Sequence, residues 1–488
     1  MPDAIIKLEN VSYAYPRSRN WALKKLDLEI GEGEFLAVMG ENGAGKTTFC
    51  RLLNGIVPHS QGGEFRGAVT VDGELTIGTL ASLTRKVGMV LDDGETQLFS
   101  DTVRGEAAFG PENLLLPGDE IEERVRFALE ATGLAQYANA APGTLSGGQK
   151  QRLAIAAALA LGGKILVLDE PTSQLDPAGA GEVLSLIRDL RERQRVTVIM
   201  ATHNSEEAAA FADRICVLKD GAIAACAAPG SIFCDSALLE NCGIRPLGPD
   251  ILRPSGEGIL SAGNTMPVIQ IDNLSFSYDS GNNINNVNII DNLSLDIADN
   301  EITAIIGQNG GGKTTLLKTI TGLLRPTGGD IFIRGKNTRE MTVSAISAEI
   351  GFVMQNPDRQ LFADTVYNET AYALKNTAIP EDEIRVRVEA ALAAVGLTEK
   401  SNVFPPALSR GDRAKTVIAS VLAMGSKILI LDEPELGQDY RSSRRIMDIM
   451  QGLHERGYTI VFVTHNMVLA AEYARRIIEI KGRKGNGN

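Results

Sequence analysis

Two glycine-rich stretches carry the residue types that bind a polyphosphate. The stretch 40–47 follows an apolar run over 34–39 and fits the pattern G-x-x-x-x-G-K-[ST]. Glycines let such a loop wrap around phosphates, so that its N–H groups point at the anion. Its lysine reaches the β- and γ-phosphates and the adjacent hydroxyl ligates Mg²⁺. The stretch 307–314 repeats the pattern after the apolar run 302–306, so two nucleotide sites are predicted. A plain turn before a helix is the alternative, which the preceding strands disfavour.

Two apolar segments end in adjacent carboxylates further along the chain. Residues 165–170 and 428–433 both read as a buried strand followed by Asp-Glu. An aspartate at this place can hold Mg²⁺, and a glutamate can polarise an attacking water. A helix N-cap with a first-turn charge is the alternative, but the upstream phosphate loops favour hydrolysis.

Histidines also follow strands in both halves. His203 and His465 come directly after the apolar runs 196–201 and 459–463, each preceded by a threonine. A single histidine at a strand end is usually structural. Two of only four histidines at equivalent positions indicate a function.

Composition limits the classes of protein to consider. The 488 residues exceed what one core usually holds, so two or three domains are expected. A net charge of −13 without a long basic run argues against nonspecific binding to nucleic acid. The longest apolar run, 153–163, is too short to span a bilayer, so no transmembrane segment is expected. Five cysteines without a C-x-x-C pair indicate reduced thiols rather than metal ligands, namely Cys50, Cys216, Cys226, Cys234 and Cys242.

The chain is a tandem repeat. Each motif returns at nearly the same separation, which indicates two copies of one domain. The copies are predicted to span 1–242 and 267–480, with a Gly/Pro/Ser-rich linker at 243–266 and a polar tail at 481–488. Strands alternate with helical patterns, such as 120–132 and 381–395, so each copy is predicted to be α/β with a largely parallel sheet.

The segment 145–152, Leu-Ser-Gly-Gly-Gln-Lys-Gln-Arg, opens a predicted helix. Together with the phosphate loops, the Asp-Glu strand ends and the histidines, it makes the chain resemble the ATP-binding-cassette (ABC) ATPases, twice over. The resemblance implies two P-loop NTPase domains that pair with each other, ATP and Mg²⁺ as cofactors, and Tyr15 and Tyr278 stacked on adenine. It also implies that each ATP lies between one domain's loop and the other domain's signature segment.

The resemblance assigns a role to each site residue. The expected catalytic residues are Glu433, His465, Gln355, Glu170 and His203. The expected Mg²⁺ ligands are Thr47, Asp169, Thr314, Gln355 and Asp432. The expected nucleotide contacts, besides the two tyrosines, are Gly40, Asn42, Gly43, Gly45, Lys46, Thr47, Thr48, Gly307, Asn309, Gly310, Gly312, Lys313, Thr314 and Thr315 from the loops, and Ser146, Gly148, Gln149, Ser409 and Gly411 from the signatures.

A finer resemblance concerns the segments after the loops. Residues 97–114 resemble the ATPases of energy-coupling-factor (ECF) importers, and 355–366 repeat the pattern more loosely. This implies import of a vitamin or a transition-metal ion, with a transmembrane coupling protein and a small substrate-binding membrane protein as partners. It places the chain peripherally at the cytoplasmic face of the cell membrane. A conventional ABC transporter ATPase is the nearest alternative. A soluble ABC protein of translation or DNA repair would need a long charged segment, a coiled-coil insertion or a cysteine cluster, and none is visible.

The aromatic residues of these segments suggest a docking surface. Phe99, Phe109 and Phe362 lie where the family receives membrane helices, and an apolar groove is expected there. A place in the hydrophobic core is the alternative for each of them.

The two predicted sites are not equal. Asp92 stands where the family has glutamine, whereas the second copy keeps Gln355. The second signature, 408–412, carries Arg410 and Asp412 in place of glycine and glutamine. Because the sites are shared, both departures fall in the site of the first loop, and the site of the second loop is complete. Neutral drift is the alternative, and the retained Glu170 and His203 leave binding or slow turnover open.

Overall fold

The structure is a computed structural model that describes residues 4–77, 80–92, 94–247, 267–278, 288–307, 310–377, 379–435 and 438–480. The chain forms two compact units, one made by residues up to 248 and the other by most of the residues from 249 on. Most of the expected linker and the tail 481–488 lie outside the described residues. The first residues of that linker belong to the first unit, where Ile244 is buried beside Leu239.

The first unit contains a central sheet in the order β10-β9-β3-β8-β7-β6 within the described residues. Strands β9, β3, β8, β7 and β6 are parallel, and β10 is antiparallel to β9. The strands β3, β7 and β8 are buried at every residue, as parallel strands covered on both faces must be. The bounds are β3 Phe35–Met39, β6 Val87–Val90, β7 Ile165–Asp169, β8 Thr197–Ala201, β9 Arg214–Lys219 and β10 Ala222–Ala227.

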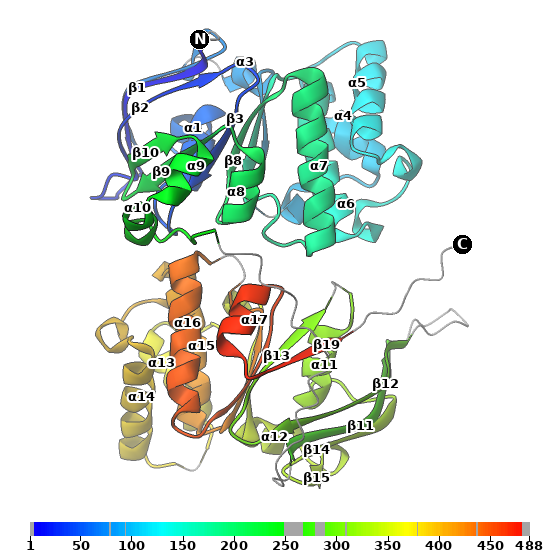
Figure 1. Cartoon of the computed structure of the whole chain (residues 1–488), viewed down its shortest axis with the longest axis vertical. Helices are drawn as coiled ribbons and strands as arrows, with labels where there is room; N and C mark the ends of the chain where they lie inside the picture. The colour runs from blue at the N-terminus through cyan, green and yellow to red at the C-terminus, as the bar shows by residue number, and fades with distance from the viewer. Residues whose placement is uncertain are drawn as a thin grey trace. The chain divides into compact units, whose positions relative to one another are not determined.

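A second, antiparallel sheet in the order β2-β1-β4-β5 packs on the same core (Figure 1). Its strands are β1 Ala4–Ala14, β2 Leu23–Gly31, β4 Glu64–Val71 and β5 Glu74–Leu75. A separate cluster forms beneath α4, α5 and α6. The helices are α1 Lys46–Leu53, α2 Ile56–His59, α3 Leu80–Thr84, α4 Val103–Asn113, α5 Gly118–Ala131, α6 Gly147–Ala160, α7 Pro177–Gln194, α8 Ser205–Phe211, α9 Pro229–Cys234 and α10 Ser236–Asn241.

The second unit repeats this arrangement. Among its described residues, a parallel sheet has the order β16-β17-β18-β13-β19 and an antiparallel sheet the order β12-β11-β14-β15. The strands are β11 Pro267–Ser277, β12 Asn288–Ala298, β13 Ile302–Gly307, β14 Gly328–Ile333, β15 Lys336–Asn337, β16 Ile350–Val353, β17 Ile428–Asp432, β18 Thr459–Val463 and β19 Arg476–Ile480. The helices are α11 Lys313–Ile320, α12 Val343–Glu349, α13 Val366–Lys375, α14 Glu381–Val395, α15 Arg410–Met424, α16 Tyr440–His454 and α17 Met467–Tyr473.

These elements confirm the predicted α/β class. The two helical patterns expected at 120–132 and 381–395 are α5 and α14. In each unit the phosphate loop joins a central strand to a helix, β3 to α1 and β13 to α11. Within the described part of the chain, no helix is both long and apolar enough to cross a bilayer.

Candidate nucleotide sites

The first phosphate loop is held close to its neighbours, which explains its glycines. Gly40 has φ +147°, and a Cβ there would lie 2.2 Å from the carbonyl oxygen of Leu218. Gly45 has φ +107° and leaves only 2.8 Å between such a Cβ and the Ala22 carbonyl oxygen. Helix α1 begins at Lys46, whose ammonium donates to the Gly40 carbonyl at 2.9 Å. The loop N–H groups and this ammonium thus surround one position for an anion.

The second phosphate loop repeats this geometry. Gly307 has φ +157°, with a hypothetical Cβ 2.5 Å from the Ile480 carbonyl oxygen. Lys313 begins α11, and its ammonium donates to the Gly307 carbonyl at 2.9 Å. Asn309, which was expected to contact the nucleotide, lies outside the described residues.

A hydroxyl and a carboxylate meet beside each loop. The Thr314 hydroxyl donates to Asp432 Oδ2 at 2.9 Å, and the Thr47 hydroxyl hydrogen-bonds Asp169. The other carboxylate oxygen, Oδ1, of each aspartate is buried and has no hydrogen-bond partner in the described part of the chain. Oxygen ligands with a free buried oxygen suit a small divalent cation such as Mg²⁺.

In the second unit, Glu433, the glutamate expected to be catalytic, lies beside two other residues expected at the same site. Glu433 Oε1 is 2.7 Å from His465 Nε2, and the Gln355 amide donates to Glu433 Oε2 at 2.7 Å. Burial opposes the charge of Glu433. The adjacent His465 ring and the Gln355 amide outweigh burial and lower the pKa of Glu433 below its ordinary value. This carboxylate is therefore ionised and oriented at neutral pH.

The first unit brings the equivalent groups together differently. His203 Nε2 lies 3.3 Å from Glu170 Oε1 and 3.1 Å from the Lys46 ammonium. Asp92 is exposed, and its backbone oxygen accepts from the Gln174 amide at 3.4 Å. Glu170 therefore receives no carboxamide like that of Gln355 from this position.

Burial dominates the electrostatics of this first site. It raises the pKa of Glu170 to about 8, an effect that the charge of Lys46 only partly offsets. Burial also lowers the pKa of His203 to about 3. Glu170 is consequently mostly protonated at neutral pH, and a protonated carboxyl cannot accept a proton from water.

The signature segments begin helices in both units. Ser146 caps α6 in a capping box with Gln149, whose side chain accepts from the Ser146 N–H at 2.9 Å. Ser409 caps α15 and accepts from the Asp412 N–H at 3.2 Å. Gly148 and Gly411 lie in the first turns of these helices.

The side chain of Asp412 is paired within its own unit. Its carboxylate accepts from Lys400 at 2.6 Å and from Lys415 at 3.2 Å. Burial opposes its charge, but the two lysines lower the pKa of Asp412 below its ordinary value. A negative charge at this position of the signature would repel a γ-phosphate, but the two lysines largely offset it, because opposite charges at hydrogen-bond distance neutralise its field.

The two tyrosines expected at adenine differ in their surroundings. Tyr15 is half-buried, its hydroxyl lies 2.9 Å from Thr48 Oγ1, and its ring packs edge-on against Tyr13. Tyr278 is 48% exposed and contacts Phe276 edge-on. The ring of Tyr278 is therefore the more accessible to a base.

A pair of carboxylates beside the expected catalytic residues was not predicted from the sequence. Glu207 accepts from the Thr172 hydroxyl at 2.8 Å in the first unit. In the second unit Glu435 replaces that threonine and hydrogen-bonds the Thr464 hydroxyl. The only signal in the sequence is the change from Asp-Glu-Pro-Thr to Asp-Glu-Pro-Glu.

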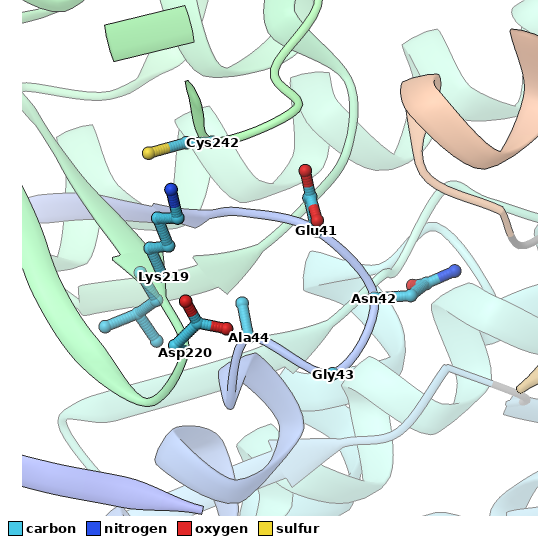
Figure 2. A pocket seen from close by; sticks show the side chains of 8 residues that line it. Glu41, Asn42, Gly43, Ala44, Lys219, Asp220 and Cys242 are labelled. Atoms are coloured by element: carbon cyan, nitrogen blue, oxygen red, sulfur yellow. The ribbon is translucent and has the colours of Figure 1, made fainter. Parts of the chain in front are cut away.

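A cavity of about 90 Å³ adjoins the first loop (Figure 2). Loop residues 41–44 form one side, and residues 218–220 with Cys242 form the other. It lies on the β9–β10 side of the loop.

Comparison with known proteins shows the family to which the chain belongs. The family model described as ABC transporter matches residues 23–173 and 290–435. The chain belongs to the ABC transporter family. A provisionally named ABC transporter ATP-binding protein of Caldanaerobacter subterraneus subsp. tengcongensis is 36% identical over 99% of this chain and 90% of its own length. A second protein so named, from Methanosarcina acetivorans, is 37% identical over 98% of this chain and 84% of its own length.

Among solved structures, cbiO1 from Clostridium perfringens, described as part of the ABC transporter complex cbiONQ, is 34% identical. It aligns with 49% of this chain and 94% of its own, with a TM-score of 0.44. The assignment rests on the sequence matches, which span both units. The protein is an ABC ATPase that binds ATP through two cassette domains.

Replacement of Tyr278 by alanine should weaken ATP binding at the second loop. Stacking of a base on an aromatic ring contributes about 1–3 kcal/mol, and this ring is exposed. The measurement is the affinity for a fluorescent ATP analogue at fixed Mg²⁺ in a Lys46→Ala background. Tyr278→Phe, which keeps the ring, is the control. Equal affinity of the alanine and phenylalanine variants would remove Tyr278 from the adenine site.

The buried Glu170 predicts a pH dependence of stability. Its folded-state pKa of about 8 exceeds the ordinary value of 4.5, so the folded state holds this proton more tightly. The free energy of unfolding should therefore fall as pH rises from about 4.5 to about 8, at up to about 1.4 kcal/mol per pH unit. Glu170→Gln should flatten this fall, measured by denaturant unfolding without nucleotide or Mg²⁺.

Glu433→Gln is the matched control, because the pKa of Glu433 is lowered instead. The stability that Glu433 contributes is present above its unfolded pKa and is lost as pH falls through the lower folded value. Its replacement should leave the alkaline decline in place. Parallel pH profiles for wild type and Glu170→Gln would contradict the burial argument.

Proposed function

We propose that this ATPase energises an ECF-type importer of a micronutrient, a vitamin or a transition-metal ion. It would work at the cytoplasmic face of the cell membrane with a transmembrane coupling protein and a small substrate-binding membrane protein. The observation that supports this most directly is an exposed aromatic pair at the same place in both units. The pairs lie in the segments 97–114 and 355–374, in and just after the stretches that resemble ECF ATPases.

The aromatic pairs are built alike. Phe99 is 62% exposed and packs edge-on against Phe109, which is 45% exposed, at 4.4 Å between ring centroids. Phe362 is 64% exposed and packs in the same way against Tyr372, which is 49% exposed, also at 4.4 Å. This exposure excludes the core as the place of these rings. Apolar rings displayed in pairs favour packing of a partner's helix over them.

A buried carboxylate holds each pair in place. Glu106 on α4 accepts from the N–H groups of Phe99 and the following residue, at 3.0 and 2.8 Å. Glu369 on α13 does the same for Phe362 and its successor, at 2.8 and 2.7 Å. Both glutamates are buried. Charge-assisted bonds of this kind fix a loop firmly, as a rigid docking surface requires.

The site of the second loop is proposed to carry most of the hydrolysis. Phosphoryl transfer depends mainly on positioning and on stabilisation of charge. Glu433 is ionised and would accept a proton from the attacking water, while Gln355 and His465 orient it. Mg²⁺, held by Thr314, Asp432 and Gln355, would neutralise charge on the phosphates.

The site of the first loop is proposed to bind ATP and to turn it over slowly. Glu170 is mostly protonated at neutral pH, and Asp92 does not supply the carboxamide that Gln355 supplies. Mg²⁺ would be held there by Thr47 and Asp169. The altered signature with Arg410 would cap this nucleotide, in the family's arrangement of loops and signatures.

The two catalytic glutamates should therefore respond differently to replacement. Glu433→Gln should lower steady-state ATPase activity of the assembled complex by about 10²-fold or more, as loss of a well-placed charged group does. Glu170→Gln should retain a substantial fraction, because that glutamate is already mostly protonated. Both variants should still bind an ATP analogue. Equal losses of activity would show that the two sites are equivalent or strictly coupled.

Charged substitutions at the exposed rings should disrupt docking of the membrane subunits without disrupting the fold. Phe99→Asp and Phe362→Asp should abolish co-purification with membrane subunits but keep the melting temperature and basal ATPase activity, because both rings are exposed. Phe127→Asp on α5, 44% exposed, is the matched control and should co-purify normally. Co-purification of the two loop variants at wild-type levels would contradict the proposal. Recovery with ribosomes or DNA instead would favour a soluble ABC protein.

A further inference from the structure

Two cysteines face each other across the β9–β10 hairpin. Cys216 on β9 is paired in register with Cys226 on β10, and the two thiols share a hydrogen bond. Both are free thiols in this structure. Directly opposite residues of an antiparallel pair have Cβ atoms about 4.5–5.5 Å apart, close to the roughly 3.5–4.5 Å that a disulfide spans. A small movement of the hairpin is enough to join them.

The two sulfur atoms have unequal surroundings. The Arg214 guanidinium donates to Cys226 Sγ at 3.0 Å, and Cys226 is only half-buried. The hydrogen bond from Cys216, together with Arg214, lowers the pKa of Cys226 to about 6. Cys216 is fully buried, and the hydrogen bond with Cys226, together with burial, raises its pKa well above the ordinary value. Cys226 is thus an accessible thiolate next to a protected thiol, the arrangement of an attacking and a resolving cysteine.

We propose that Cys226 and Cys216 form an oxidant-sensitive thiol pair that a hydroperoxide converts into a cross-strand disulfide, and that this disulfide weakens nucleotide binding by the first phosphate loop. A dithiol reductant reverses the modification.

The chemistry balances in two steps. The Cys226 thiolate attacks the peroxide oxygen, an S–O bond forms, the O–O bond breaks, and the released alkoxide or hydroxide takes up a proton. Cys216 then attacks the Cys226 sulfur as its proton leaves. An S–S bond forms, the S–O bond breaks, and hydroxide departs with that proton as water. In total two thiols lose two electrons and two protons, and the hydroperoxide becomes an alcohol (water, from hydrogen peroxide) and a second water.

The β9–β10 hairpin packs directly against the first phosphate loop, whose nucleotide binding the disulfide would weaken. The Gly221 N–H, in the β9–β10 turn, donates to the Ala44 carbonyl of the first loop at 3.1 Å. The Leu218 carbonyl lies where any Cβ on Gly40 would clash. Drawing β9 and β10 together therefore moves the surface against which the loop N–H groups are positioned. The cavity on this side of the loop (Figure 2) leaves room for that movement.

The experiment treats the full chain, in a Cys234→Ser background, with stoichiometric hydrogen peroxide, then blocks free thiols and digests the protein. Cleavage after Lys219 separates the two cysteines, so a disulfide appears as a linked peptide that dithiothreitol releases. The expected result is this linked peptide in good yield. Cys226→Ser should leave Cys216 reduced, and Cys216→Ser should stop at sulfenic acid on Cys226. Arg214→Gln should slow the reaction severalfold.

Nucleotide binding is measured in the same chain with Lys313→Ala, so that a fluorescent ATP analogue with Mg²⁺ reports the first loop. Oxidation should weaken binding severalfold, dithiothreitol should restore it, and the Cys216→Ser/Cys226→Ser variant should be insensitive. Absence of the linked peptide would overturn the proposed thiol pair. So would oxidation of the exposed Cys234 as fast as that of Cys226 in the chain that retains Cys234. A linked peptide with unchanged affinity would overturn its coupling to the loop.

Discussion

The close packing of each phosphate loop against the strand beside it is the constraint on which both sites depend. Gly40 and Gly307 lie against the carbonyl oxygens of Leu218 and Ile480, at distances that leave no room for a Cβ. Because of this packing, each loop leaves its strand, β3 or β13, in a fixed direction. The helices α1 and α11 then begin at Lys46 and Lys313. The strands that carry the carboxylates and histidines run parallel beside them, so their carboxyl ends meet the loop.

Within this shared framework, the two copies differ in charge rather than in backbone. Glu433 is held ionised by two polar neighbours, whereas burial keeps Glu170 mostly protonated. His465 contributes most to holding Glu433 ionised, and the Gln355 amide adds to it. Burial dominates at Glu170, and Asp92 supplies no carboxamide. The proposed division between a hydrolysing copy and a nucleotide-holding copy rests on this difference.

A carboxylate lies near the histidine in each copy, but the two copies supply it from different positions. In the first unit Glu207 on α8 bonds the Thr172 hydroxyl, and in the second Glu435 takes the place of that threonine. The position on α17 equivalent to Glu207 is Leu469, which is buried in the core. Each unit therefore keeps carboxyl–hydroxyl hydrogen bonding at this place, with the carboxyl supplied from a different element. Burial raises the pKa of both carboxyls, that of Glu435 to about 7.

The sequence alone determined the repeat, the α/β class, the loops and the order of the chemical groups. These follow from local patterns, since apolar runs such as 165–169 and 302–306 specify buried strands, and glycine spacing specifies a loop. Tertiary structure alone decided the state of the groups. The pairing of Asp412 with Lys400 and the protonation of Glu170 depend on residues distant in the chain and on burial. The exposure of Phe99 and Phe362 and the pairing of Cys216 with Cys226 depend likewise on packing and strand register, which no local pattern encodes.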